Sequence, residues 1–252
     1  EISLGYQHRG IEETLTGGPT SRSLHLMETA AGDTTIGHTT AYSHIVESLG
    51  RRQPSARAQT IAGIALELER LANHVGDVGA LSNDVGFLPT ASFCGRLRGD
   101  YLNMTALLCG NRFGRGMITP GGVGFDIDET RAQTLLTRLE PVARDTASAI
   151  TLLWDASSAM ARFENTGVLS ADDCRELGIV GPAARASGLA LDARQTQPWG
   201  IYRFSQIPAS VSQSGDVFAR GYIRWLEIQR SIVFIREDRK STRLNSSHES
   251  PS

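Results

Sequence analysis

Apolar residues recur every three or four positions along much of the chain, which is the pattern of helices with one buried face. The longest run begins after Pro54, with Ser55 in the position of an N-cap, and extends to about residue 84. Its apolar positions are Ile61, Ile64, Leu68, Leu71, Val75, Val78 and Leu81. Its expected polar side carries Glu67, Glu69, Arg70, Asn73, His74 and Asp77. We therefore expect one long helix here.

Two glycines, Gly76 and Gly79, lie inside this predicted helix. Each costs about 1 kcal/mol relative to alanine in a helix interior. Their presence predicts that another backbone approaches the helix closely at this level.

Further helical patterns cover residues 39–50, 97–108 and 128–160, with Pro141 as a site for a kink, and a last helix starts at Asp216. The stretch "RFGRGMITPGGV" (112–123) predicts a turn and loop. Because "TPGGVGF" lacks the strand and helix that flank a dinucleotide-binding loop, a structural turn is favoured over a nucleotide site. The fold class expected is mainly α: one helical-bundle domain with loops and small strand inserts.

Composition and charge are those of an ordinary globular protein: 252 residues, 40% hydrophobic, 21% charged and a net charge of −2. Nothing favours binding to nucleic acid or an anionic membrane, and the apolar runs are too short to span a bilayer. Cys94, Cys109 and Cys174 are scattered without metal-ligand spacing. They are expected to be reduced thiols in a cytoplasmic protein.

The last residues, "DRKSTRLNSSHESPS" (238–252), differ from the rest of the chain. They contain almost no apolar residues, and Lys240 is the single lysine among 25 Lys and Arg. "DRKSTRLNSSH" also matches a reading frame of a common sequencing-library adapter. We expect residues 238–252 to be disordered adapter read-through, with a natural disordered tail as the alternative, and residues 1–237 to be a fragment of one domain.

The candidate chemistry lies in "ETAAGDTTIGHTTAY" (28–42), a stretch of small residues typical of a ligand loop. On the long helix, His74 and Asp77 lie one turn apart and could share a proton or a metal, or form a hydrogen-bonded helix face. His38 and His44 are six apart and fall on different faces, which disfavours a joint metal site.

Six blocks together resemble one family: "LGYQHRGIEETL" (4–15), "AYSHIVESL" (41–49), "ELERLANHVGDVGALSNDVGF" (67–87), "RFGRGMITPGGV" (112–123), "VGPAARASGLALDAR" (180–194) and "GDVFARGYIRWLEIQRSI" (215–232). In order and spacing they resemble the large subunit shared by respiratory complex I, where it is the D subunit of NADH–quinone oxidoreductase, and membrane-bound nickel–iron hydrogenases of the formate-hydrogenlyase type. The resemblance implies a helical bundle docked against a small iron–sulfur subunit, from whose cluster electrons arrive.

The same resemblance places the family's active site in residues 28–42. Hydrogenases of the family hold nickel and iron there with two cysteines, which align with Ala31 and Thr34; the preceding arginine aligns with Thr29. A nickel–iron site is therefore not expected, since alanine has no donor atom and threonine is a poor ligand for soft metals. The quinone-binding tyrosine of complex I aligns with Gly32. We therefore interpret Ala31, Asp33, Thr34 and His38 as a degenerate site loop.

By the same resemblance, His8, Arg9 and His74 would face the partner's iron–sulfur cluster, although a buried ion pair explains Arg9 equally well. No metal or cofactor bound directly by this chain is expected, and NADH would bind another subunit. Two functions stay open: a redox subunit attached through its partners to the inner face of the cell membrane, or a non-catalytic structural subunit. In a third interpretation, Asp33, Thr34, Thr35 and His38 bind a quinone or another acceptor in a different way.

Overall fold

The structure is a computed structural model that describes the backbone of residues 9–246 and the side chains of residues 9–237. Its elements are α1 (Ile11–Leu15), α2 (Ser23–Met27), α3 (Thr35–Gly50), α4 (Ala56–Asp84), α5 (Leu88–Cys109), β1 (Ile118–Thr119), β2 (Gly122–Val123), α6 (Glu129–Trp154), α7 (Ser157–Phe163), α8 (Ala171–Glu176), α9 (Gly181–Ala186), α10 (Ala193–Thr196), the 3-10 helix η1 (Gly200–Arg203) and α11 (Val217–Ser246). The predicted mainly helical fold with small strand inserts is confirmed.

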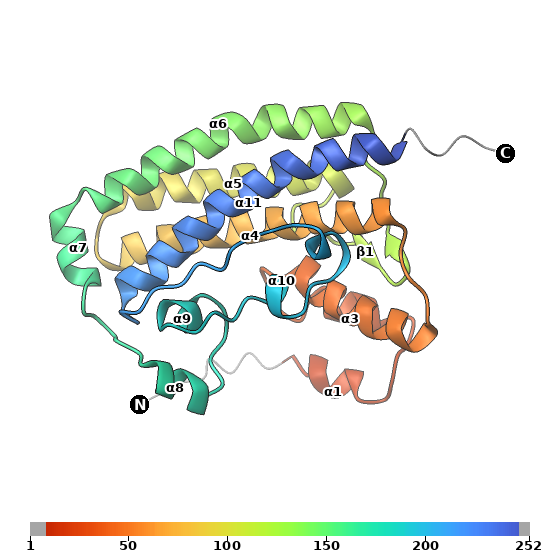
Figure 1. Cartoon of the computed structure of the whole chain (residues 1–252), viewed down its shortest axis with the longest axis horizontal. Helices are drawn as coiled ribbons and strands as arrows, with labels where there is room; N and C mark the ends of the chain where they lie inside the picture. Colours follow the sequence, from red (N-terminus) through yellow and green to blue (C-terminus); the bar gives the residue numbers. More distant parts are fainter. Residues whose placement is uncertain (1–8, 247–252) are drawn as a thin grey trace.

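Four long helices form the bundle: α4 packs against α5 and α11, and α6 packs across α5. Figure 1 shows these helices running alongside one another, with α3 and the short helices α8–α10 grouped on the other side of α4. The predicted N-cap of α4 is confirmed, because the Ser55 hydroxyl accepts a hydrogen bond from the Ala58 amide.

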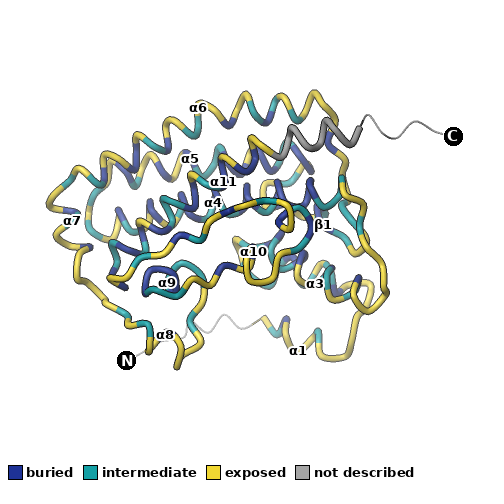
Figure 2. Tube along the Cα trace, viewed as in Figure 1, coloured by how far each residue is buried: buried dark blue, intermediate teal, exposed yellow. Residues whose placement is uncertain are grey.

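The core follows the buried stripe of α4. Leu68, Leu71 and Val75 are completely buried, and they share one contiguous cluster with Leu97 of α5 and Ile228 of α11. Figure 2 shows buried residues along α4 and a largely exposed outer side of α6. Burial of such a stripe is the main favourable term that holds helices of this kind together.

The glycines of α4 have the predicted effect at one of the two positions. A Cβ atom on Gly79 would lie 2.7 Å from Cβ of Cys94, with the backbone of Ala91 and Cys94 also within 4 Å. A Cβ atom on Gly76 would instead meet the side chain of Arg98 at 2.9 Å. The close approach of α5 to α4 at Gly79 is therefore confirmed, whereas at Gly76 a side chain fills the space.

Three predicted helix boundaries are wrong. α3 begins at Thr35 rather than at residue 39, and α5 begins at Leu88 rather than at residue 97. In α5 the early turns bury small or polar side chains such as Thr90 and Cys94, which give no strong apolar period. The helix predicted over residues 128–160 is divided into α6 and α7, because Ala156 has an extended backbone.

The glycine-rich loop after α5 forms a small hairpin, with Ile118 paired to Val123 and Thr119 to Gly122. The predicted turn is confirmed, since the two strands pair on either side of Pro120 and Gly121. At the other end of the chain, the backbone of α11 is helical through Ser246. The origin of residues 238–252 as adapter read-through stays a prediction.

Within residues 9–246, no helix combines the length and the hydropathy needed to cross a bilayer.

Candidate functional site

The expected ligand loop is a short turn followed by a helix. Ala31, Asp33 and Thr34 lie in the connection between α2 and α3, whereas His38 lies in the first turns of α3. Residues 28–42 are rich in small side chains, and the structure uses them to bring this turn close to α4 and the hairpin. His8 lies outside the described residues, so its predicted place beside the partner's iron–sulfur cluster stays a prediction.

Glu69 of α4 holds the start of α3. Its carboxylate accepts hydrogen bonds from the backbone amides of Ile36 (2.7 Å) and Gly37 (2.9 Å). A carboxylate at a helix N-terminus is favourable, because it satisfies amides that have no partner within the helix. Burial nevertheless raises the pKa of Glu69 to about 7, since the loss of solvation outweighs the two amides and the Arg70 charge.

The polar atoms of Asp33 are engaged by both neighbouring helices. The Arg98 guanidinium of α5 lies 2.7 Å from the Asp33 carboxylate, and the Asn73 amide of α4 donates to the Asp33 carbonyl at 2.8 Å. Glu28, at the start of the turn, accepts a hydrogen bond from the Gly116 amide at 2.6 Å. The turn is therefore fixed by contacts from α4, α5 and the loop before the hairpin.

The other candidates in the loop have few contacts. The side chains of Thr34 and His38 form no hydrogen bond with another residue in the described part of the chain. Arg9 donates to the carbonyl of Ala30 at 3.0 Å and is exposed. The structure thus places Arg9 beside the turn, and the side chains of Asp33, Thr34 and His38 are not joined in one hydrogen-bonded cluster.

The donor atoms in this loop do not fit a nickel–iron centre. Ala31 supplies no donor atom, Thr34 supplies a hydroxyl, and the Asp33 carboxylate is paired with Arg98. Among the described residues, no group of three or more His, Cys, Asp or Glu side chains is arranged to hold a metal ion. Burial raises the pKa of the Cys94 thiol to about 11, which keeps it a protonated core residue.

A buried ionic network is centred on Glu67 of α4, two positions before Glu69. Its carboxylate lies 3.2 Å from the Arg194 guanidinium and 3.2 Å from the Arg70 guanidinium. It also accepts hydrogen bonds from the Tyr202 hydroxyl at 2.7 Å and from the Ser231 hydroxyl. Arg194 is in turn paired with Asp192 at 2.7 Å. Glu67 is completely buried, so its placement on the polar side of the helix was wrong.

The second half of the network is centred on Glu227 of α11. Its carboxylate lies 2.6 Å from the Arg185 guanidinium and 2.7 Å from Nε2 of His74. Arg70 lies between the two halves, 3.7 Å from Glu227. Burial lowers the pKa of His74. Because a carboxylate only accepts, Nε2–H of His74 is the donor in the contact with Glu227. Arg224 pairs with Asp77 at 2.7 Å, so His74 and Asp77 each have another partner, and the structure favours the hydrogen-bonded helix face over a shared proton.

The network connects α4, α9, α10 and α11 through equal numbers of acidic and basic side chains. Three carboxylates (Glu67, Asp192, Glu227) face three guanidinium groups (Arg70, Arg185, Arg194). Sequence reasoning missed it, although one signal was available: Glu67 follows Ile64 by three positions and precedes Leu71 by four, which places it on the apolar stripe. Such a site serves to fix the relative positions of four elements, since unpaired buried charges are costly.

A family model for the 49 kDa subunit of the respiratory-chain NADH dehydrogenase matches residues 84–248. The chain belongs to this family. It is 32% identical over 240 residues to the carbon monoxide-induced hydrogenase of Rhodospirillum rubrum, covering 94% of this chain and 66% of that protein. It is 29% identical over 240 residues to the D subunit of F420H2 dehydrogenase from Methanosarcina mazei, covering 94% of this chain and 63% of the relative.

A third relative of the same family is the D subunit of NADH–quinone oxidoreductase from Saccharopolyspora erythraea, 28% identical over 234 residues, which cover 93% of this chain and 52% of the relative. The chain thus spans between about half and two thirds of the length of these relatives. The resemblance inferred from the six sequence blocks is confirmed at the level of the family.

Proposed function

We propose that this chain is the large subunit of a membrane-associated electron-transfer oxidoreductase complex and receives electrons from a partner subunit that carries an iron–sulfur cluster. The observation that supports it is the breadth of the match. A hydrogenase, a subunit of F420H2 dehydrogenase and a subunit of NADH–quinone oxidoreductase each align with 93–94% of this chain. Their names give different reactions, so the aligned region corresponds to what they share.

What those relatives share by name is electron transfer within an oxidoreductase, and two of them are named as subunits. We place the acceptor site at the turn before α3. Thr34 and His38 supply polar side chains there that have no hydrogen-bond partner among the described residues. The Asp33 carboxylate is paired with Arg98, and the Thr35 hydroxyl donates to the Glu28 carbonyl, so these two groups border the site. A quinone is the acceptor whose carbonyl oxygens fit such hydrogen-bond donors. In this proposal Arg9, which donates to the Ala30 carbonyl, and His8 face the partner subunit.

His74 takes a different role in this proposal. Its side chain is buried and Nε2 is bonded to Glu227, so it influences a partner's cluster through the ionic network and not by direct contact. Attachment to the inner face of the cell membrane would then come from partner subunits.

A second function, a structural subunit that holds a cluster protein without catalysis, is favoured by one observation. The positions that carry metal ligands and the quinone tyrosine in the resembling families are Ala31, Thr34 and Gly32 here. Neither alanine nor glycine has a polar side chain. Both functions require that the chain assembles with the iron–sulfur subunit, but only the first requires that the complex catalyses electron transfer.

The decisive experiment is co-expression of the chain with a small iron–sulfur subunit of a complex of this family. If the chain is a redox subunit, the complex should be stable and should transfer electrons from reduced viologen to a soluble quinone analogue. The double variant Thr34→Val, His38→Leu should lower the rate of this electron transfer at least about tenfold, because the polar contacts with the substrate are lost. A complex without turnover would support the structural function. If no complex forms, both functions are wrong.

A further inference from the structure

A cavity of about 540 Å³ lies beside α3, from Thr40 to the C-terminal end of the helix. Its other walls come from the connection to α4, the first turns of α4, the hairpin and the segment around η1. Asp33, Thr34 and His38 are not among the residues that line it. The volume falls in the range of about 300–1,000 Å³ that is usual for small-molecule sites.

Cations predominate around this cavity. Arg51, Arg52 and Arg203 line it, against the single carboxylate of Glu47. In the described part of the chain, the guanidinium groups of Arg51 and Arg52 have no hydrogen bond or ion pair. The Glu47 carboxylate accepts a hydrogen bond from the Gly121 amide at 2.8 Å. The cavity therefore favours an anion, and guanidinium groups match the geometry of phosphate and carboxylate.

The backbone positions one of these arginines unusually. Arg51 is the C-cap of α3 and adopts a left-handed conformation with φ of 49°. This conformation is uncommon outside glycine and asparagine, and it costs a larger residue free energy. Its amide caps the helix through the carbonyls of Glu47 and Ser48, so the turn is held while the side chain stays unpaired.

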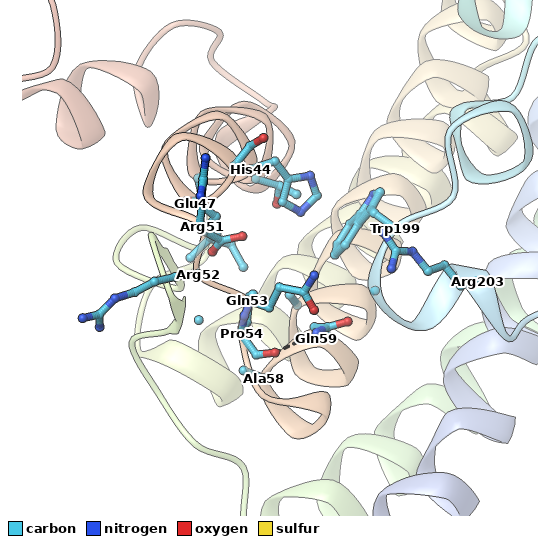
Figure 3. Close-up of a pocket in the computed structure, with 17 residues that line it drawn as sticks. His44, Glu47, Arg51, Arg52, Gln53, Pro54, Ala58, Gln59, Trp199 and Arg203 are labelled. Carbon is cyan, nitrogen blue, oxygen red and sulfur yellow. Dashed lines mark hydrogen bonds between the residues drawn. The ribbon is translucent and has the colours of Figure 1, made fainter.

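Aromatic and amide groups form the other side. Trp199 packs edge-on against His44, with ring centroids 4.5 Å apart. Figure 3 shows these two rings close together, Arg203 beside Trp199, Gln53 between Trp199 and the end of α3, Gln59 below Trp199 and beside Pro54, and Arg52 directed away from the others. Gln59 donates its amide to the Pro54 carbonyl at 2.7 Å, which leaves its side-chain oxygen as an acceptor.

Two hydroxyls in the wall lack partners. The Oγ atoms of Thr40 and Ser43 are enclosed and have no hydrogen bond within the described chain. Buried hydroxyls are normally satisfied, so this wall lacks polar contacts that a bound molecule or its water shell would supply.

We propose that this cavity binds an anionic small molecule with a planar ring, of the mononucleotide class. Its phosphate lies toward Arg51 and Arg203, and its ring packs beside Trp199. The proposal is independent of the redox function, because Asp33, Thr34 and His38 do not line this cavity and binding needs no partner subunit.

The test is isothermal titration calorimetry of the chain with AMP, using adenosine and inorganic phosphate as separate probes. AMP should bind at one site, and Arg51→Asn and Arg203→Gln should each weaken binding about tenfold, the loss expected for one charge-assisted contact. Asparagine tolerates the left-handed backbone, so Arg51→Asn should keep the fold, which circular dichroism checks. Arg138→Gln, an exposed change of equal charge on α6, should bind AMP like the wild type.

Absence of AMP binding to the wild type would overturn the proposal, as would equal binding by all the variants. Inorganic phosphate that binds as tightly as AMP would contradict the role of the ring. Adenosine that binds as tightly as AMP would contradict the role of the arginines.

Discussion

The carboxylate of Glu69 lies 2.7 Å from the backbone nitrogen of Ile36, so one acidic side chain of α4 holds the first turn of α3. The same carboxylate takes the next amide, that of Gly37. Glu69 is only 9% exposed, so its carboxylate loses most of its contact with water when it makes these hydrogen bonds. The position of the whole candidate turn therefore depends on a group whose charge changes near neutral pH.

Stability should fall as the pH rises through the pKa of Glu69. That pKa is raised by burial from 4.5 to about 7, so the folded state binds a proton that the unfolded state has released. The resulting stabilisation is fully present below about pH 4.5 and is lost as the pH rises through 7. Between pH 5 and pH 8, this group should lower the free energy of unfolding by up to about 3 kcal/mol.

Urea unfolding at pH 5 and pH 8 measures the effect, with Glu69→Gln as the variant that cannot titrate. The wild type should lose more stability over this interval than Glu69→Gln. The exposed Glu13→Gln variant is the control and should follow the wild type. Identical pH dependence in the wild type and Glu69→Gln would show that Glu69 does not titrate in this range.

Breaking the Glu67–Arg194 pair should destabilise the chain strongly. Arg194→Met leaves the completely buried Glu67 with Arg70 as its one remaining cation among the described residues, and removal of one partner of a buried pair typically costs about 3–5 kcal/mol. Replacing both residues, as Glu67→Met with Arg194→Met, should cost less than the sum of the single variants. Thermal and urea unfolding of the three variants measure this coupling.

The control for this cycle is the exposed pair of Arg96 and Asp145, which lies at 2.9 Å with both side chains about half exposed (52% and 53%). Arg96→Met should change the free energy of unfolding by less than about 1 kcal/mol. Equal losses from Arg96→Met and Arg194→Met would contradict the special role of the buried network.

Helix content and family could be predicted from the sequence because both are carried by extended patterns. The stripe from Ile61 to Leu81 indicated α4, and six ordered blocks indicated the family. The buried state of Glu67 and the pairing of His74 with Glu227 could not be predicted in this way, because their partners lie 127 to 164 positions away along the chain. A one-dimensional period shows which side a residue faces, and it does not show what stands opposite.

The site loop illustrates the same limit. Its lack of cysteines at Ala31 and Thr34 was evident from the sequence, whereas its fixation by Glu69, Arg98 and Asn73 required the fold. The start of α3 at Thr35 was missed because threonines and glycine give no apolar period there.

The packing of α5 on α4 predicts opposite effects for two glycines. Gly79→Ala places a Cβ atom 2.7 Å from Cβ of Cys94, so it should destabilise the chain by about 1–3 kcal/mol. Gly95→Ala, in α5, meets no atom within 4 Å and should stabilise it by about 0.4–1 kcal/mol. Urea midpoints of the two variants give the comparison. Stabilisation by Gly79→Ala would mean that the two helices are not in close contact.

Restoring cysteines at Ala31 and Thr34 should not create a hydrogenase. The double variant supplies two thiolates, yet Thr29 still replaces the arginine of the hydrogenase pattern, and the described residues hold no further group of metal ligands. We expect no nickel above background by elemental analysis and no hydrogen evolution with reduced viologen. Stoichiometric nickel together with hydrogen evolution would overturn this view of the loop.

Deletion of residues 238–252 should leave the melting temperature unchanged within error. The segment has almost no apolar residues, so its removal takes little apolar surface out of the protein interior. The deletion retains Phe234 and Ile235, which are buried in the core, and the Arg236–Glu140 ion pair at 2.7 Å. Phe234→Ala is the matched comparison and should cost about 3–5 kcal/mol. A clear fall in melting temperature on deletion would show that the segment stabilises the fold. That result would contradict its interpretation as adapter read-through.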